Sequence, residues 1–453
     1  MRHVLIAVFA SLALASEAHA QRDFEEFRRR EAESLRAFLS KEDADFSDFL
    51  KQEWKEFELS VADKPLVRPK PRATPVAPPK PDVPAGNPDA PARPTRPADP
   101  APDPAPTPEP EPKPEPEPAP TPIPVGPPPS ASLIGGGVPS RSPMPTRPIP
   151  DAPVELASAP NAIRTSFYGG IVPVPKVELR LDPMPSPITG AAVGKFWEQM
   201  SASKSQEVLA SLQRQRLQMR LGDWAFAQLA FRAGVGLTGG DSTLARLVAW
   251  HFLVKSGFAS RVGFRGGDLF VLLRTDEVLY GVPYFTIDKS KVYVLDLASG
   301  SAIRAGSIHT YERDHPDAKT PLSFHMKTLP LLPDDAQSRT LAFTYKGKRH
   351  EIRAEVNRNL IRFLTHYPQT QLNGYLDAEV PSSAMDALVS GLRPIIAGQP
   401  EVEQVQMILR FVQTAFEYKT DGDQFSREKW MFPEETLFYP FSDCEDRAIL
   451  FSY

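Results

Sequence analysis

Proline dominates one long segment of this chain and divides the rest into separate parts. From Lys64 to about Pro160 the sequence consists largely of proline, alanine and charged residues, and it holds most of the 51 prolines. Closely spaced prolines favour polyproline II and leave too few apolar residues for a core. We therefore expect residues 63–160 to be a disordered linker that reaches about 300 Å at ~3.1 Å per residue. A ligand for proline-reading modules is the alternative.

The first twenty residues have the pattern of an export signal. A basic start at Arg2 precedes an apolar run from Val4 to Ala15, and Ala18 and Ala20 form an A-x-A cleavage pattern. The mature chain is then expected to begin after residue 20, in the periplasm or outside the cell. No later apolar run approaches the length of a membrane helix, so no transmembrane span is predicted.

Composition excludes several classes of protein. A net charge of −4 over 453 residues gives no reason to expect a nucleic-acid partner. Cys444 is the single cysteine, so an exported chain of this kind cannot rely on disulfides for its core. Judged by its sequence position alone, a structural role for Cys444 is as well supported as a functional one. That structural role would be a small buried hydrophobic residue or a dimer disulfide.

Aromatic and apolar residues recur every eleven residues near the N-terminus. The series predicts an amphipathic or coiled-coil helix over residues 21–62, with its apolar stripe between Phe24 and Phe57. An apolar stripe of this kind has to be buried against another surface. We expect burial by self-association through residues 24–57, by a partner helix or by a membrane surface. The alternative is that the stripe packs on the chain's own downstream domain.

Folded sequence begins near Ile163 and is expected to form an α+β domain over residues 161–340. Helices are predicted at 193–220, 221–232 and 244–255, followed by an antiparallel sheet with strands at 259–264, 269–273, 282–288 and 291–297. A second part, residues 341–453, starts with a hairpin at 341–356. In it a helix is predicted from Val402 to Phe416, with Val405, Ile408, Leu409, Val412 and Phe416 on its buried face.

Cys444 stands where a turn leads into a helix. Ser442-x-x-Glu445 fits a capping box, and Asp443 is an alternative N-cap. The unpaired amides and the dipole of a helix N-terminus favour a thiolate, so we expect a lowered pKa at Cys444 and assign it as a candidate nucleophile. Glu445 and Asp446 are more simply capping residues.

The stretch from Val402 to Tyr453 resembles the transglutaminase-like superfamily, which consists of thiol enzymes of papain-like architecture. The residues that carry the resemblance are Ser442-Asp443-Cys444-Glu445-Asp446-Arg447-Ala448-Ile449-Leu450, with Ala415-Phe416-Glu417-Tyr418 and Trp430-Met431-Phe432-Pro433-Glu434-Glu435 before them. The resemblance implies that the cysteine opens a core helix and that a histidine and an aspartate follow it on strands. Only Cys444 can be carried over. The family usually has glycine where this chain has Ser442, and the match covers about an eighth of the sequence.

Residues 221–297 show a fainter likeness to the same family. Gly240-Asp241-Ser242 leads into an apolar helix, and Tyr284-Phe285 falls where the family has its histidine. One interpretation is a degenerate first copy without catalysis. The other is an unrelated α+β domain.

These observations lead to a function hypothesis with one open alternative. The chain is expected to be an exported, tethered cysteine hydrolase or acyltransferase that acts on peptide or isopeptide amides. It is present as a form truncated after the nucleophile helix, and it is therefore inactive as given. The alternative is a non-catalytic envelope protein that binds or scaffolds a partner. The histidines lack metal-ligand spacing, and we predict neither a metal nor a cofactor.

Overall fold

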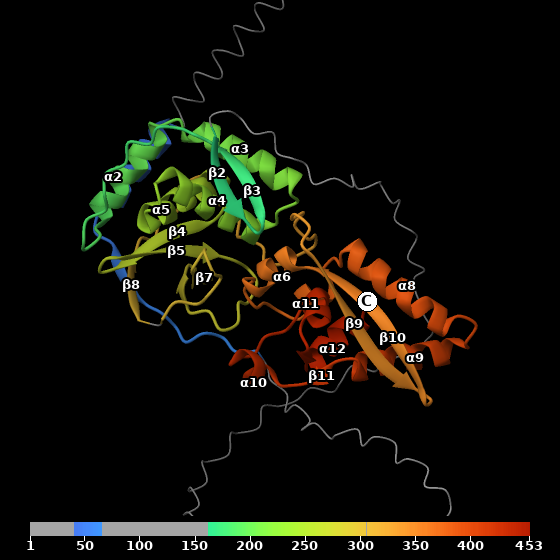
Figure 1. The fold of residues 1–453 in the computed structure, drawn as a ribbon. Helices are drawn as coiled ribbons and strands as arrows, with labels where there is room; N and C mark the ends of the chain where they lie inside the picture. Colours follow the sequence, from blue (N-terminus) through green and yellow to red (C-terminus); the bar gives the residue numbers. More distant parts are fainter. Residues whose placement is uncertain (1–39, 66–161, 305) are drawn as a thin grey trace, which may run out of the picture. The chain divides into compact units, whose positions relative to one another are not determined.

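The computed structural model describes residues 40–65, 162–304 and 306–453, which form mixed α and β elements (Figure 1). The predicted export signal, nearly all of the predicted linker and the first half of the predicted N-terminal helix lie outside these residues. Within them, no helix has both the length and the apolar composition needed to cross a membrane.

An antiparallel sheet of six strands is the centre of the first folded part. Its strand order is β1-β8-β4-β5-β7-β6. The strands are β1 (Lys55–Glu58), β4 (Ser260–Arg265), β5 (Asp268–Arg274), β6 (Tyr284–Ile287), β7 (Ser290–Leu295) and β8 (Ser307–Thr310). The four strands predicted between residues 259 and 297 are confirmed, because each coincides with one of β4 to β7 within a few residues.

The sheet curls until its two edges nearly meet. Ser60, just after edge strand β1, forms a bridge with Tyr284 of the other edge strand, and its amide donates to the Tyr284 carbonyl over 2.7 Å. The Gly281 amide donates to the Asp63 carbonyl in the same region. Pairing of this kind satisfies part of the backbone that an open edge would expose.

Both faces of the curled sheet are apolar, which explains why β5 reads as an unbroken hydrophobic run. Side chains alternate between the faces of a strand. Leu269, Val271 and Leu273 therefore join the large core beneath the helices. Leu272 joins a second cluster on the opposite face, with Leu59, Phe285, Ile287, Val292, Val294 and Ile308.

Four helices and a hairpin build the large core against the sheet. The elements are β2 (Ala162–Phe167), β3 (Gly170–Pro175), α2 (Gly190–Ser201), α3 (Ser205–Gln218), α4 (Asp223–Leu237) and α5 (Ser242–Lys255). The prediction of a single helix over 193–220 is wrong, because the helix is interrupted between α2 and α3. The pair α4 and α5 packs closely at Gly234, where a Cβ atom would lie only 2.6 Å from the Ala245 carbonyl oxygen.

The predicted N-terminal helix is wrong in its last part. Residues 40–50 are helical, but the chain then turns and residues 55–58 pair with β8 as strand β1. Phe46, Leu50 and Trp54 are buried in the large core, and the Ser47 hydroxyl donates to the Gly194 carbonyl over 2.9 Å. These described aromatic residues therefore pack on the chain's own domain and are not available for self-association.

The second part is a long hairpin wrapped by helices. Strand β9 (Ala336–Tyr345) runs across the expected domain boundary at residue 340 and pairs with β10 (Lys348–Asn357). The elements that follow are α6 (Arg358–Thr365), α7 (Asn373–Leu376), α8 (Ser382–Ile396), α9 (Glu401–Thr414), β11 (Glu417–Tyr418), α10 (Asp421–Phe425), α11 (Pro433–Phe438), β12 (Phe441–Ser442) and α12 (Cys444–Phe451). Helix α8 packs on β10 and α9 packs on β9.

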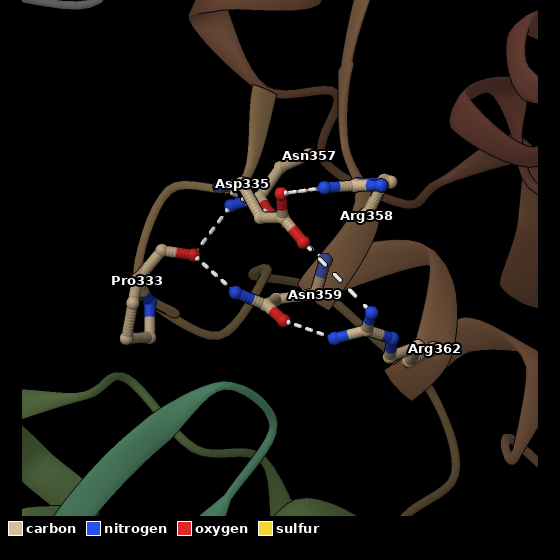
Figure 2. A network of polar contacts seen from close by, with 6 residues as sticks. All are labelled: Pro333, Asp335, Asn357, Arg358, Asn359 and Arg362. Carbon is tan, nitrogen blue, oxygen red and sulfur yellow. Dashed lines mark hydrogen bonds and ion pairs between the residues drawn. The ribbon is translucent and has the colours of Figure 1, made fainter. Parts of the chain in front are cut away.

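A polar network fixes the point where β10 passes into α6 (Figure 2). Asn357 caps α6 by accepting from the Asn359 amide. Both asparagine side chains donate over 3.0 Å to the Pro333 carbonyl. Asp335 accepts from Arg358 at 3.0 Å, and Arg362 donates to the Asn359 side chain. Because these bonds link the start of the hairpin to its end, they set the direction of α6.

Helix α9 buries only part of the face that the sequence predicts. Val412 and Phe416 are buried as predicted, together with Met407 and Phe411, whereas Val405 and Leu409 are exposed. The helix packs against β9, α12 and α8.

A buried carboxylate connects the N-terminal segment to the core. Asp43 lies 2.7 Å from the Lys255 ammonium and 3.2 Å from Nε2 of His315, and it accepts from the Trp197 indole. Burial by itself raises the pKa of Asp43, but the contacts with His315 and Lys255 outweigh burial and lower it to about 2. The Lys255 side chain is only 7% exposed, and its ammonium also lies 3.2 Å from Asp317.

Replacing Asp43 should destabilise the protein more than replacing its exposed neighbour Asp45. Asp43→Ala is expected to cost about 3 kcal/mol at pH 7, because it leaves a buried cation short of a partner. Since the pKa of Asp43 is lowered on folding, its contribution should be present above pH ~4 and be lost as the pH falls through about 2. Urea unfolding of Asp43→Ala and Asp45→Ala at pH 7 and at lower pH measures the loss of stability and its pH dependence. Equal unfolding midpoints for the two variants at pH 7 would contradict a stabilising role of Asp43.

Candidate functional site at the start of α12

Cys444 is the first residue of α12 and is partly exposed. The residue before it, Asp443, is the N-cap, and Asp443 and Asp446 form a reciprocal capping box. The capping box predicted between Ser442 and Glu445 is therefore wrong, and the alternative N-cap, Asp443, is the one used. Ser442 ends β12 and its hydroxyl accepts from the Arg447 guanidinium over 3.0 Å.

The expected lowering of the Cys444 pKa is also wrong. Burial raises the pKa of this thiol, and the hydrogen bond to Glu445 and the charges of Glu445 and Asp443 add to the rise, to about 11. The thiol donates to Glu445 over 3.1 Å. A helix N-terminus does favour an anion, but here neighbouring carboxylates already occupy that positive field.

Three buried aspartates lie beside the cysteine. Asp421, Asp443 and Asp446 each have a carboxylate oxygen within 4.8 Å of the others. Sequence reasoning missed this cluster. The Asp443-x-x-Asp446 spacing was a usable signal, but Asp421 comes from α10 and nothing in its local sequence points to the other two.

Three carboxylates of this kind could bind a divalent cation through their oxygens, but backbone amides already donate hydrogen bonds to them. Asp446 accepts from the Met431 amide at 2.8 Å and from the Asp443 amide at 3.2 Å. Asp421 accepts from the Lys429 amide. Burial, followed by the charges of Asp443 and Asp421, raises the pKa of Asp446 well above its ordinary range. The arrangement is a hydrogen-bonded acid cluster that favours a retained proton.

Arg447 locks the cysteine helix to the elements before it. Its guanidinium donates to the carbonyls of Gln413 at 2.7 Å and Phe416 at 3.0 Å, near the end of α9. It also reaches Ser442, whose strand β12 pairs in parallel with β11. The position of Cys444 is therefore fixed by backbone contacts on two sides.

The loop before α11 is packed and carries buried charge. Lys429 donates to Glu435 over 2.7 Å, and both side chains are at least nine-tenths buried. Glu434 beside them is also buried, and its two oxygens have no hydrogen-bond partner within the described residues. Burial, with smaller effects from the charges of Glu435 and Glu379, raises the pKa of Glu434 to about 8.

Each histidine in the described ranges has its contacts away from Cys444. His251 is buried among aromatic rings, neither of its ring nitrogens has a hydrogen-bond partner within the described residues, and burial lowers its pKa to about 3. His366 lies against Tyr168. The others contact Asp43 (His315), Asp377 (His325), Phe264 (His309) and Phe343 (His350). The structure brings none of them to Cys444.

Comparison with known proteins identifies no relative: no family model, curated protein or solved structure matches this chain.

The Cys444 thiol should alkylate slowly at neutral pH. With a pKa of about 11, about one thiol in ten thousand is ionised at pH 7, so the iodoacetamide rate should climb roughly tenfold per pH unit up to pH 10. Glu445→Gln should raise the rate at pH 7, since it removes the acceptor and its charge. Glu401→Gln, on an exposed site of α9, should leave it unchanged. A rate that levels off near pH 7 in the unmodified chain would overturn this electrostatic account.

Glu434 should make the fold less stable as the pH rises. Its pKa is raised on folding, so its contribution is full below pH ~4.5 and is lost as the pH rises through about 8. Between pH 5 and pH 8 the loss should be on the order of 3 kcal/mol. Glu434→Gln should flatten this dependence in urea unfolding, whereas exposed Glu207→Gln should not. Parallel pH profiles for all three proteins would contradict it.

Proposed function

We propose that this protein is an exported cysteine enzyme of the transglutaminase-like kind, which cleaves or transfers acyl groups at peptide or isopeptide amides with Cys444 as nucleophile. One observation carries the proposal: the single cysteine opens a helix that is anchored from two sides. Ile449 of α12 packs in the large core, and Leu450 packs in the core of the second part. A nucleophile needs this fixed position.

The chemistry follows from the thiol. A base takes the thiol proton, the thiolate attacks the amide carbon, and the amine leaves with a proton, which leaves a thioester on Cys444. Water or a second amine then attacks the thioester and frees the thiol. The backbone amide of Cys444 would donate to the negative oxygen formed on the way.

The same proposal assigns the general base to residues other than those described. With its pKa near 11 the thiol needs a proton acceptor, and Glu445 is a carboxylate that holds the proton on sulfur. A histidine placed beside Cys444 would lower the thiol pKa by favouring the thiolate. We therefore assign the base, and the acid that orients it, to groups outside the described residues.

A non-catalytic binding or scaffold protein is the second candidate, and the raised pKa of Cys444 is the observation that favours it. A thiol that stays protonated at neutral pH suits a structural role. The two candidates differ in one property, which is whether an acyl group can be trapped on sulfur.

Acylation of Cys444 tests the proposal. The product of the complete gene, incubated with p-nitrophenyl acetate and hydrolysed to peptides, should carry the acetyl group on Cys444 and release a burst of nitrophenol. Cys444→Ser should abolish both signals. A chain that lacks the other members of such a catalytic unit should give no burst, since their loss costs about a million-fold in turnover.

A control is needed to interpret the absence of acetylation at Cys444. Alkylation at pH 10 followed by mass spectrometry shows whether Cys444 is accessible in the complete product. An accessible Cys444 that acquires no acetyl group would rule out the enzyme and favour the scaffold.

A further inference from the structure

Five loops enclose a cavity of about 580 Å³. It is formed by the loop before β6, the loop between β7 and β8, the loop after α6, the loop before α11 and residues 64–65. Cys444 is not among its lining residues. The volume lies within the range of sites that take a small molecule or the end of a peptide.

Two cations converge on this cavity without an acidic partner. Lys64 and Arg427 both line it and are exposed, and neither forms an ion pair within the described residues. Most other buried or half-buried cations in the same ranges are paired, as Lys255 and Arg261 are. Glu428 on the same rim is engaged in an interaction of its own. The surplus charge at the cavity is positive, which favours an anionic ligand.

His366 contributes a neutral group to the wall. Its Nδ1 lies 3.3 Å from the Tyr168 hydroxyl, which itself donates to Gln228. Burial, together with the charge of Arg232, lowers the pKa of His366, so the imidazole is uncharged at neutral pH. The positive charge at the cavity therefore comes from Lys64 and Arg427.

A buried amide lacks an acceptor in the same wall. Gln369 lines the cavity and is 5% exposed, and its side-chain nitrogen has no hydrogen-bond partner within the described residues. Its backbone carbonyl is fixed, because it accepts from the Tyr280 amide over 2.8 Å. An unsatisfied buried donor costs free energy, and a ligand oxygen would remove that cost once the side chain rotates its nitrogen, which is closed to solvent here, toward the cavity.

The remaining wall is apolar and aromatic. It includes Tyr280, Val282, Tyr367 and Pro368. The Tyr367 hydroxyl already donates to the Phe324 carbonyl, and Tyr280 is held edge-on against Trp430 at 5.8 Å between ring centroids. Rings fixed in this way are suited to contact an apolar body.

We propose that this cavity binds a carboxylate joined to an apolar or aromatic body, such as the C-terminal end of a peptide. Lys64 and Arg427 meet the carboxylate charge, the Gln369 amide donates to one of its oxygens or to the adjacent carbonyl, and the rings of Tyr280 and Tyr367 contact the body. The described lining offers two cations, Lys64 and Arg427, which match the charge of a single carboxylate better than that of a polyanion. The site is independent of the chemistry proposed for Cys444.

Calorimetric titration with N-acetyl-phenylalanine tests the site, with its amide and inorganic phosphate as comparison ligands. The acid should bind at millimolar concentration or tighter, and the amide should bind at least about tenfold more weakly, because it lacks the charge. Arg427→Ala, Lys64→Ala and Gln369→Leu should each weaken binding of the acid. Lys348→Ala, at the exposed first residue of β10, and Cys444→Ser should leave it unchanged.

Each outcome decides the proposal. Absence of saturable binding of the acid, equal affinity for acid and amide, or equal affinity for phosphate would overturn it. Circular dichroism and the unfolding midpoint of each variant distinguish loss of the site from loss of the fold. Unchanged binding in Cys444→Ser keeps this test separate from failure of the proposed enzyme.

Discussion

The short N-terminal segment between Asp43 and Ser60 is the constraint on which the first folded part depends. It supplies Phe46 and Leu50 to the large core, Leu59 to the opposite face of the sheet and Ser60 to the bridge between the sheet edges. Asp43, together with Asp317, meets the ammonium of the largely buried Lys255 side chain. A sheet with two apolar faces needs cover on both, and this segment contributes to both.

A competition between dipole and carboxylates governs the start of α12. The helix N-terminus stabilises anions, and the chain places Asp443, Glu445 and Asp446 there. Burial and the charges of neighbouring acids raise the pKa of Asp446 and the pKa of the Cys444 thiol. Arg447 holds the start of α12 in place, whereas the negative charge of the acids around Cys444 disfavours a thiolate. The position of Cys444 thus suits a nucleophile, whereas its present protonation does not.

Local sequence patterns predicted most of the strands and helices. Packing between distant parts of the chain decided the features that these patterns missed. The strands between 259 and 297 and the hairpin around Gly347 follow from alternation and turn residues, which act within a few residues. The helix expected through Phe57 failed, because pairing with β8 overrode the helical periodicity. The position of Cys444 at a helix start was predicted, but its pKa was not. That pKa depends on burial and on contacts such as the one with Glu445, which spacing alone does not provide. Asp421 and the cavity at Gln369 come from distant loops and left no local signal.

The most direct test is the kinetic pKa of the Cys444 thiol in the product of the complete gene, measured from the pH dependence of iodoacetamide alkylation. The proposed enzyme requires a base beside the sulfur, so the account predicts a pKa near or below neutrality there, against about 11 for the 453-residue chain. A value that stays near 11 in the complete product would contradict a catalytic cysteine and leave Cys444 a structural residue.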